Sequence, residues 1–200
     1  MAEAHIKEKS KQLFFSYGMI SVSMNDIAQM CCVSKKSIYQ YFEDKNTLVC
    51  AIVHELIQSH KRLLKICRVA AKNAIDEVIK QSAEPFEIWA AIRPSFFYEL
   101  EKFFPQAWHE LEQYRLKLYN GITHNLEWGR QEGFYRTNIN TALVAELRLL
   151  QLTHFLQQNF ATTQQWSSHQ SVMELTSLYL HSIAAEKGTK RLYTIYKNNH

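Results

Sequence analysis

The feature that most constrains the fold of this chain is its scarcity of glycine and proline. The 200 residues include only 5 glycines and 3 prolines, whereas average usage would put Gly near ~7% and Pro near ~5%. A β-sandwich or β-barrel of this length needs many tight turns and is richer in both residues. No two glycines have the spacing of a phosphate-binding loop, GxGxxG or GxxxxGK. We therefore expect an all-α fold in which long helices are joined by few connections.

The apolar and charged content is that of a protein with a packed core. Hydrophobic residues make up 46% of the chain and charged residues 21%, a balance that disfavours disorder. No apolar run approaches the ~18 residues of a membrane span, and the polar N-terminus lacks the apolar stretch of a signal peptide. We therefore expect a cytoplasmic protein with no membrane partner. The net charge of +4 is weak evidence for a nucleic-acid partner, because distribution matters more than number.

Cysteine and histidine patterns argue against a metal site and against catalysis. Cys31, Cys32, Cys50 and Cys67 all lie in the first third of the chain and form no CxxC pair, so neither a disulfide framework nor a zinc site is expected. The histidines form no HxxxH or HExxH pair, and no GxSxG motif occurs. We expect no enzyme activity, no catalytic residues, no metal and no cofactor. Buried reduced thiols are the simplest interpretation of the cysteines, and a redox role for the adjacent pair stays open.

The first part of the chain is divided into short helices. Apolar residues recur at helical spacing over 6–17, and Gly18 suits the end of that helix. Ser23 with Asp26 three residues later resembles a capping box, and Ser34 can cap a third helix. Two short helices joined by a tight turn describe a helix-turn-helix, whose second helix enters the DNA major groove.

Longer helices are expected after this region. Asp44 can cap a helix that continues to about residue 72. Helical spacing predicts further helices over these approximate ranges: 73–92, 94–104, 105–133, 140–160 and 168–186. Gly188 is expected to end the last helix before a short basic tail. Gly121 and Gly129, inside one predicted helix, indicate close packing or a kink.

The segment over residues 6–48 resembles the tetracycline-repressor (TetR) family of bacterial regulators. The resemblance is carried, without an insertion, by Ile6, Leu13, Phe14, Gly18, Ser23, Ile27, Ala28, Val33, Ser34, Ile38, Tyr39, Tyr41, Phe42, Lys45 and Leu48. It implies a helix-turn-helix DNA-binding domain over 1–47 and a larger helical ligand-binding and dimerisation domain over 48–200. A weaker similarity lies in the segment EWGRQEGFYRTNIN.

The function that the resemblance implies is transcriptional regulation. The expected protein is a homodimeric repressor that a small molecule releases from a palindromic double-stranded DNA operator. The alternative is a helical ligand-binding or protein-interaction module that does not bind DNA.

The side chains that would contact DNA follow from their chemistry and from the resemblance. Lys35 and Lys36 place cations at the start of the third helix, where phosphate or a guanine edge is within reach. Asn25 lies near the start of the second helix, whose amide groups favour phosphate oxygens. The resemblance implies seven DNA-facing positions: Asn25, Lys35, Lys36, Ser37, Tyr39, Tyr41 and Lys45. Ile38 and Phe42 are expected in the core, and the alternative is that one of the two tyrosines joins them.

One departure from the family pattern lies in the turn between these helices. The family usually has Gly where this chain has Cys32, and Ala where it has Cys31. If the turn keeps its usual geometry, Cys32 has a positive φ, which costs on the order of 1 kcal/mol.

Aromatic residues gather in the middle of the larger region, where they form either core and dimer packing or a ligand cavity between helices. A cavity of this kind would favour a flat or apolar small-molecule effector. The ligand-binding candidates are Trp89, Phe97, Trp108, Tyr119, His124, Asn125, Trp128, His154 and Phe155.

The last two long helices each have an apolar stripe. In the family, the corresponding helices pair with their copies across a dimer interface. The interface candidates are Leu143, Leu147, Leu150, Val172, Leu175 and Tyr179.

Overall fold

The computed structural model describes residues 2–83, 92, 94–157 and 168–197. Within these ranges the chain is helical and has no strand, and one isolated antiparallel bridge joins Tyr135 to Ala184. The helices are α1 (Ala2–Tyr17), α2 (Met24–Met30), α3 (Lys35–Tyr39), α4 (Lys45–Ala70), α5 (Ala74–Ala83), α7 (Pro94–Phe103), α8 (Pro105–Gln131), α9 (Thr141–Gln157), α10 (Ser168–Ile183) and α11 (Glu186–Lys197). The all-α prediction is confirmed.

The chain forms two compact units. Unit 1 contains Met1–His60, Ile88–Tyr114 and Leu156–Asn159, and unit 2 contains Lys61–Glu87, Arg115–Phe155 and Phe160–His200. The long helices α4 and α8 contribute residues to both units.

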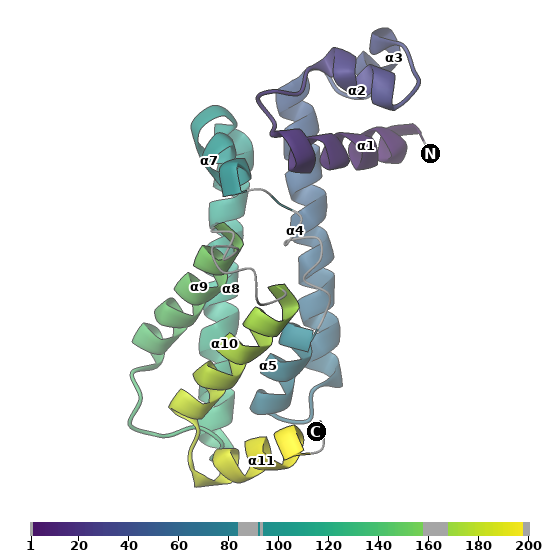
Figure 1. Cartoon of the computed structure of the whole chain (residues 1–200). Coiled ribbons are helices and arrows are strands. Elements are labelled where there is room, and N and C mark those ends of the chain that lie inside the picture. Colours follow the sequence, from purple (N-terminus) through teal and green to yellow (C-terminus); the bar gives the residue numbers. More distant parts are fainter. Residues whose placement is uncertain (1, 84–91, 93, 158–167, 198–200) are drawn as a thin grey trace. The chain divides into compact units, whose positions relative to one another are not determined.

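In unit 1, α1, α2 and α3 group beside the first turns of α4 (Figure 1). Their apolar faces meet in a core that contains Phe14, Ile27, Ile38 and Leu48, each fully buried. Burial of such side chains stabilises the domain by ~1.5–3 kcal/mol each. The short helices α2 and α3 depend on this burial, because isolated helices of their length are not stable in water.

Side-chain caps begin the helices at the expected places. The Asp26 amide donates to the Ser23 hydroxyl at 3.2 Å, and the Ser23 amide donates to the Asp26 carboxylate at 2.7 Å. These two bonds form the predicted capping box, which satisfies amides that have no partner within the helix. The Ser34 hydroxyl caps α3, and the Asp44 carboxylate accepts from the Thr47 amide at 2.7 Å at the start of α4.

Unit 1 also contains α7 and the first part of α8. The rings of Phe15 and Phe96 pack edge to face with centroids 5.5 Å apart. Near them, the Glu99 carboxylate accepts a hydrogen bond from the Ile20 amide at 3.0 Å. These contacts attach α7 to α1 and to the loop before α2.

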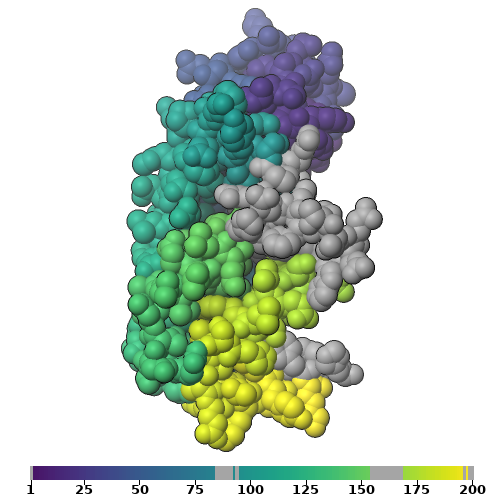
Figure 2. Space-filling model, turned by 60° about the vertical axis from the view of Figure 1, so that its left-hand side comes forward, coloured from purple at the N-terminus to yellow at the C-terminus, as the bar shows by residue number. Residues whose placement is uncertain are grey.

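In unit 2, α5, α10, α11 and parts of α8 and α9 surround one apolar core. Its fully buried members include Ile75, Leu126, Tyr135, Leu180 and Leu192. The helices α9 and α10 lie side by side (Figure 1), and Figure 2 shows them adjoining at the surface of one face. The pair buries its inner sides and leaves an outer side in solvent.

The glycines show where local expectations were right and where they failed. Gly18 has φ +87° directly after α1, as predicted for a helix end. Gly129 is buried inside α8, where a β-carbon would collide with the Tyr135 ring, so the expectation of close packing is confirmed. Gly121 has open space around it.

The expectation that Gly188 ends the last long helix is wrong. The helix α10 ends at Ile183, and Gly188 lies inside α11. A β-carbon at residue 188 would collide with the carbonyl oxygen of Phe134. The glycine therefore allows a close approach of two backbones, which the local sequence does not reveal.

Two further findings concern the limits of the helices. The helix predicted over 73–92 is described only as far as Ala83, and residues 84–91 lie outside the described residues. No helix in the described ranges is long and apolar enough to cross a membrane.

Candidate DNA interface

Buried side chains hold α2 and α3 in place at either end of a short turn. Ile27 and Ala28 anchor α2, while Ile38 anchors α3 and Phe42 follows it into the core. The expected core role of Ile38 and Phe42 is confirmed. With one face of each helix buried in this way, the opposite faces are presented to solvent.

The turn between the two helices is a Schellman motif. The Val33 amide donates to the Ala28 carbonyl at 3.0 Å, and the Cys32 amide donates to the Gln29 carbonyl at 3.1 Å. This pattern requires a left-handed residue after the helix cap, a position usually filled by glycine. Cys32 fills it with φ +55°, as the sequence predicts, and no other non-glycine residue among the described residues has a positive φ.

The polar side chains of α3 and its surroundings form an exposed surface. Asn25, Lys35 and Lys36 are exposed, and Tyr39 and Tyr41 are 44% and 47% exposed. Neither tyrosine therefore belongs to the core. This excludes the alternative that one of them packs with Ile38 and Phe42. The Lys35 ammonium lies 5.8 Å from the Tyr39 ring centroid, so a cation and a phenol occupy neighbouring places on one helix face.

Ser37 is half-buried and takes part in the cap of α3. Its hydroxyl lies 2.8 Å from the Ser34 hydroxyl, and its amide donates to the same Ser34 oxygen at 3.0 Å. One hydroxyl proton stays available for a phosphate oxygen, because only one of the two hydroxyls donates in their mutual bond.

Lys45 differs from the other six DNA candidates. Its ammonium lies 3.5 Å from the Ile20 carbonyl oxygen and is attracted by the carboxylates of Glu99 and Asp26. Partial burial lowers the pKa of Lys45 below its ordinary value. The side chain lies against its own chain, so Lys45 supports the loop between α1 and α2.

The sequence reasoning missed Glu99, which supports the same loop from α7. Its carboxylate accepts a hydrogen bond from the Ile20 amide. The same carboxylate has an oxygen only 2.8 Å from the place that a β-carbon on Gly18 would take. No sequence signal could have indicated this contact, because 79 residues separate Glu99 from Ile20.

The described ligand-binding candidates are divided between the two units. Phe97 is buried and Trp108 half-buried in unit 1. Four candidates lie on the part of α8 that belongs to unit 2: Tyr119, His124, Asn125 and Trp128. Trp89 and the side chains of His154 and Phe155 lie outside the described residues.

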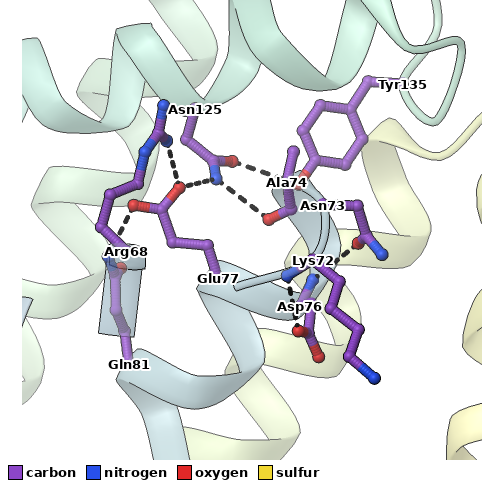
Figure 3. A network of polar contacts seen from close by, with 9 residues as sticks. All are labelled: Arg68, Lys72, Asn73, Ala74, Asp76, Glu77, Gln81, Asn125 and Tyr135. Atoms are coloured by element: carbon purple, nitrogen blue, oxygen red, sulfur yellow. Dashed lines mark hydrogen bonds and ion pairs between the residues drawn. The ribbon is translucent and has the colours of Figure 1, made fainter. Parts of the chain in front are cut away.

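Asn125 has a structural role in unit 2 (Figure 3). Its amide nitrogen donates to the Ala74 carbonyl at 2.9 Å and to the Glu77 carboxylate at 2.7 Å, and its oxygen accepts from the Tyr135 hydroxyl at 3.1 Å. Glu77 in turn forms an ion pair with Arg68. Both polar ends of this buried amide are used in joining α5 to α8, and a contact between Asn125 and a ligand stays a prediction.

Two ligand-binding candidates near Asn125 on α8 differ in their surroundings. The Arg68 guanidinium stacks on the Trp128 ring, with 4.2 Å between the Arg68 Cζ and the ring centroid. His124 is exposed to solvent.

The dimer candidates separate into exposed and buried side chains. On α9, Leu143, Leu147 and Leu150 are 55%, 53% and 47% exposed and form one stripe at helical spacing. On α10, Val172 and Tyr179 are buried. The core of their own chain covers these two side chains, and their role in a dimer stays a prediction. Leu175 is half-buried, and Leu178, which was not a candidate, is exposed on α10.

The described residues contain no group of three or more His, Cys, Asp or Glu side chains that could hold a metal ion. The exposed surface of α3 and the turn before it therefore form the principal candidate site.

The fold and this site define a DNA-binding transcriptional regulator of the helix-turn-helix class. A family model described as "Bacterial regulatory proteins, tetR family" matches residues 6–52, which span α1, α2, α3 and the start of α4. The N-terminal segment over residues 6–52 is therefore similar to the DNA-binding region of this family.

Solved structures extend the similarity of fold over about nine tenths of the chain. The ketosteroid transcriptional regulator KstR2 of Mycobacterium tuberculosis is 16% identical, with a TM-score of 0.73, 93% of this chain covered and 96% of that one. The TetR-family regulator PfmR of Thermus thermophilus is 17% identical, with a TM-score of 0.72 and coverages of 88% and 97%. A TetR-family regulator of Cytophaga hutchinsonii is 15% identical, with a TM-score of 0.74 and coverages of 92% and 96%. No curated protein matches the chain in sequence.

Proposed function

We propose that this protein is a cytoplasmic, homodimeric repressor that binds a palindromic operator and is released from it by a small molecule. The observation that carries the proposal is the exposed surface of α3, where Lys35, Lys36, Tyr39 and Tyr41 project beside a Schellman turn that sets the angle of the helix. Asn25 and Ser37 extend this surface. We propose no catalytic step.

The charges of this surface suit a phosphate backbone. No ion pair with Lys35 or Lys36 occurs in the part of the chain that the structure describes. Cations without an acidic neighbour are available to phosphate oxygens, and the release of counterions makes such binding strongly dependent on salt. The tyrosine hydroxyls can donate to phosphate or to base edges.

A homodimer is proposed because one recognition helix contacts only a few base pairs. A twofold dimer places two such helices on two half-sites about one or more turns apart. The exposed stripe of Leu143, Leu147 and Leu150, with Leu178 on the neighbouring helix, is a surface on which a second copy would pack.

DNA binding and effector binding are proposed to belong to consecutive parts of the chain. Residues 1–47 bind DNA, and residues 48–200 bind the effector and dimerise. A coupling free energy of ~1–3 kcal/mol between the two sites is enough to change operator occupancy.

The test is binding to the DNA upstream of the protein's own coding sequence, measured by fluorescence anisotropy against a scrambled duplex over a range of salt concentrations. Replacing Lys35 by Ala should weaken binding by about tenfold, corresponding to ~1.4 kcal/mol. It should also reduce the slope of log affinity against log salt concentration by about one. Lys117→Ala is the matched control, because Lys117 is an exposed lysine on α8 in unit 2.

Equal affinity for the upstream and scrambled duplexes would contradict the proposal. The same holds if Lys35→Ala and Lys117→Ala leave affinity equally unchanged. Either result would favour a helical module that does not bind DNA.

A further inference from the structure

A buried arginine in unit 2 has an incomplete set of hydrogen bonds. Arg148 lies on α9 with only 4% of its surface exposed. Its Nη2 donates to the Thr176 hydroxyl at 2.8 Å, and its guanidinium lies 4.7 Å from the centroid of the Tyr179 ring. Its Nη1 is buried and has no hydrogen-bond partner among the described residues. Leaving such a donor without an acceptor is costly, and for a charged group the cost is higher.

No carboxylate among the described residues pairs with Arg148. Glu77, a buried acid of the same unit, is already held by Arg68 and Asn125. Burial lowers the pKa of Arg148 only to about 10, so the guanidinium keeps its charge at neutral pH. Burial also raises the pKa of Tyr179 to about 12, so this phenol supplies no negative charge. No described residue therefore supplies a negative charge to balance the guanidinium, which is unfavourable in a protein core.

The neighbouring hydroxyls do not provide the missing acceptor. Ser82 donates to the Val78 carbonyl at 2.9 Å and lies 2.9 Å from the Thr176 hydroxyl. The simplest proton arrangement runs from Arg148 through Thr176 to Ser82, since each hydroxyl has a single proton. Both hydroxyls then direct their protons away from Arg148, and Nη1 still needs an anionic or neutral acceptor.

Buried apolar side chains also lie near Arg148. Ala145 and Leu149, on either side of it along α9, are buried. Tyr179 belongs to the same buried apolar cluster as Val78 and Leu180. A ligand here would place one acidic group on the guanidinium and an apolar body among these side chains. Ser82 is the next-to-last residue of α5, and Ala83 beside it is exposed.

We propose that Arg148 is the anion-binding residue of the effector site and that the effector is a small organic acid with one carboxylate on an apolar body. A guanidinium has a planar arrangement of donors that matches a carboxylate, and charge-assisted bonds of this kind are the strong ones. The bound carboxylate neutralises the buried charge and accepts the proton of Nη1. This inference rests on the proposed ligand response.

The test compares acids with alcohols of the same skeleton on the full chain without DNA. The probes are sodium octanoate against 1-octanol, and 3-phenylpropionate against 3-phenylpropanol, in thermal unfolding and isothermal titration calorimetry at constant ionic strength. A ligand that binds only the folded state raises the melting temperature by mass action. At least one acid is expected to raise the melting temperature of the protein more than its alcohol does.

Variants assign the effect to the guanidinium. Arg148→Met removes the charge at similar volume, so it should weaken acid binding by at least about tenfold while the unliganded protein melts at the same or a higher temperature. Arg148→Lys keeps the charge without the planar donors and should bind the acid with intermediate affinity. Arg115→Met is the matched control, because Arg115 is an arginine on α8 in the same unit whose side chain is 43% exposed.

Two results would overturn the inference. In one, neither acid stabilises the wild-type protein more than its alcohol does, a comparison that needs no variant. In the other, Arg148→Met responds to the acids as the wild type and Arg115→Met do. These measurements contain no DNA. A negative result would therefore contradict the ligand proposal without bearing on operator binding, which the earlier experiment tests.

Discussion

At the residue scale, Cys32 occupies a left-handed backbone position that usually holds glycine. The bonding of the turn requires a left-handed residue, and the chain supplies one with a β-carbon, at φ +55°. This conflict could be predicted from the sequence, because a Schellman cap depends on only a few neighbouring residues. The position of Lys45 could not be predicted in this way, because the Glu99 carboxylate that attracts it belongs to a distant helix.

Replacing Cys32 by Gly is expected to stabilise the protein. Removal of the β-carbon relieves on the order of 1 kcal/mol of strain, and the greater freedom of glycine in the unfolded chain offsets part of that gain. The expected net increase in the free energy of unfolding is therefore about 0.5–1 kcal/mol, measured by chemical denaturation. Cys32→Ala is the control, since it removes the thiol and keeps the β-carbon. If the two variants are equally stable, strain at this position is not the cause.

At the scale of the element, Gly121 and Gly129 both lie in α8, but their surroundings differ. Close packing requires a glycine at position 129 and not at position 121. The position of Gly129 is occupied on one side by the Tyr135 ring, whereas a β-carbon on Gly121 would have nothing within 4 Å of it. The helix itself was predictable from the spacing of its apolar residues. The reason for each glycine depends on what packs against it, which the spacing does not show.

The substitutions Gly129→Ala and Gly121→Ala are expected to have opposite signs. In an open helix position, Gly→Ala stabilises by roughly 0.5–1 kcal/mol, and this is the expectation for Gly121. At Gly129, the new methyl group must displace the buried Tyr135 ring, which should destabilise the protein by about 1–3 kcal/mol. Urea denaturation of both variants measures the difference. A stabilising Gly129→Ala would show that the ring can move aside without cost.

At the scale of the whole molecule, the exposed leucines of α9 are the feature that a single chain leaves unexplained. Leu143, Leu147 and Leu150 form an apolar stripe in solvent, beside an α10 whose Val172 and Tyr179 are buried. Surfaces of this kind mark contacts with another molecule. A second copy of the chain fits the symmetry that a palindromic operator requires.

Leu147→Glu is expected to convert the dimer into a monomer. Burying a carboxylate against apolar side chains without a partner costs several kcal/mol, which exceeds what the rest of a small interface can offset. Sedimentation velocity measures the association state, and anisotropy should show operator affinity reduced by more than about tenfold. Leu116→Glu is the control, because Leu116 is a comparably exposed leucine on α8. A Leu147→Glu variant that sediments as the wild type does would remove α9 from the interface.

The sequence by itself determined the helices other than α11, the caps of α2, α3 and α4, the helix-turn-helix and the strained turn at Cys32. Each of these depends on residues a few positions apart, through helical spacing, side-chain caps and backbone φ. Only the tertiary structure decided which face of α10 is buried, why Gly188 lies inside a helix, and that Asn125 is occupied whereas Arg148 has an unmatched donor. These features depend on contacts between residues far apart in the chain, and the balance of buried charge and hydrogen bonds exists only after the helices have packed.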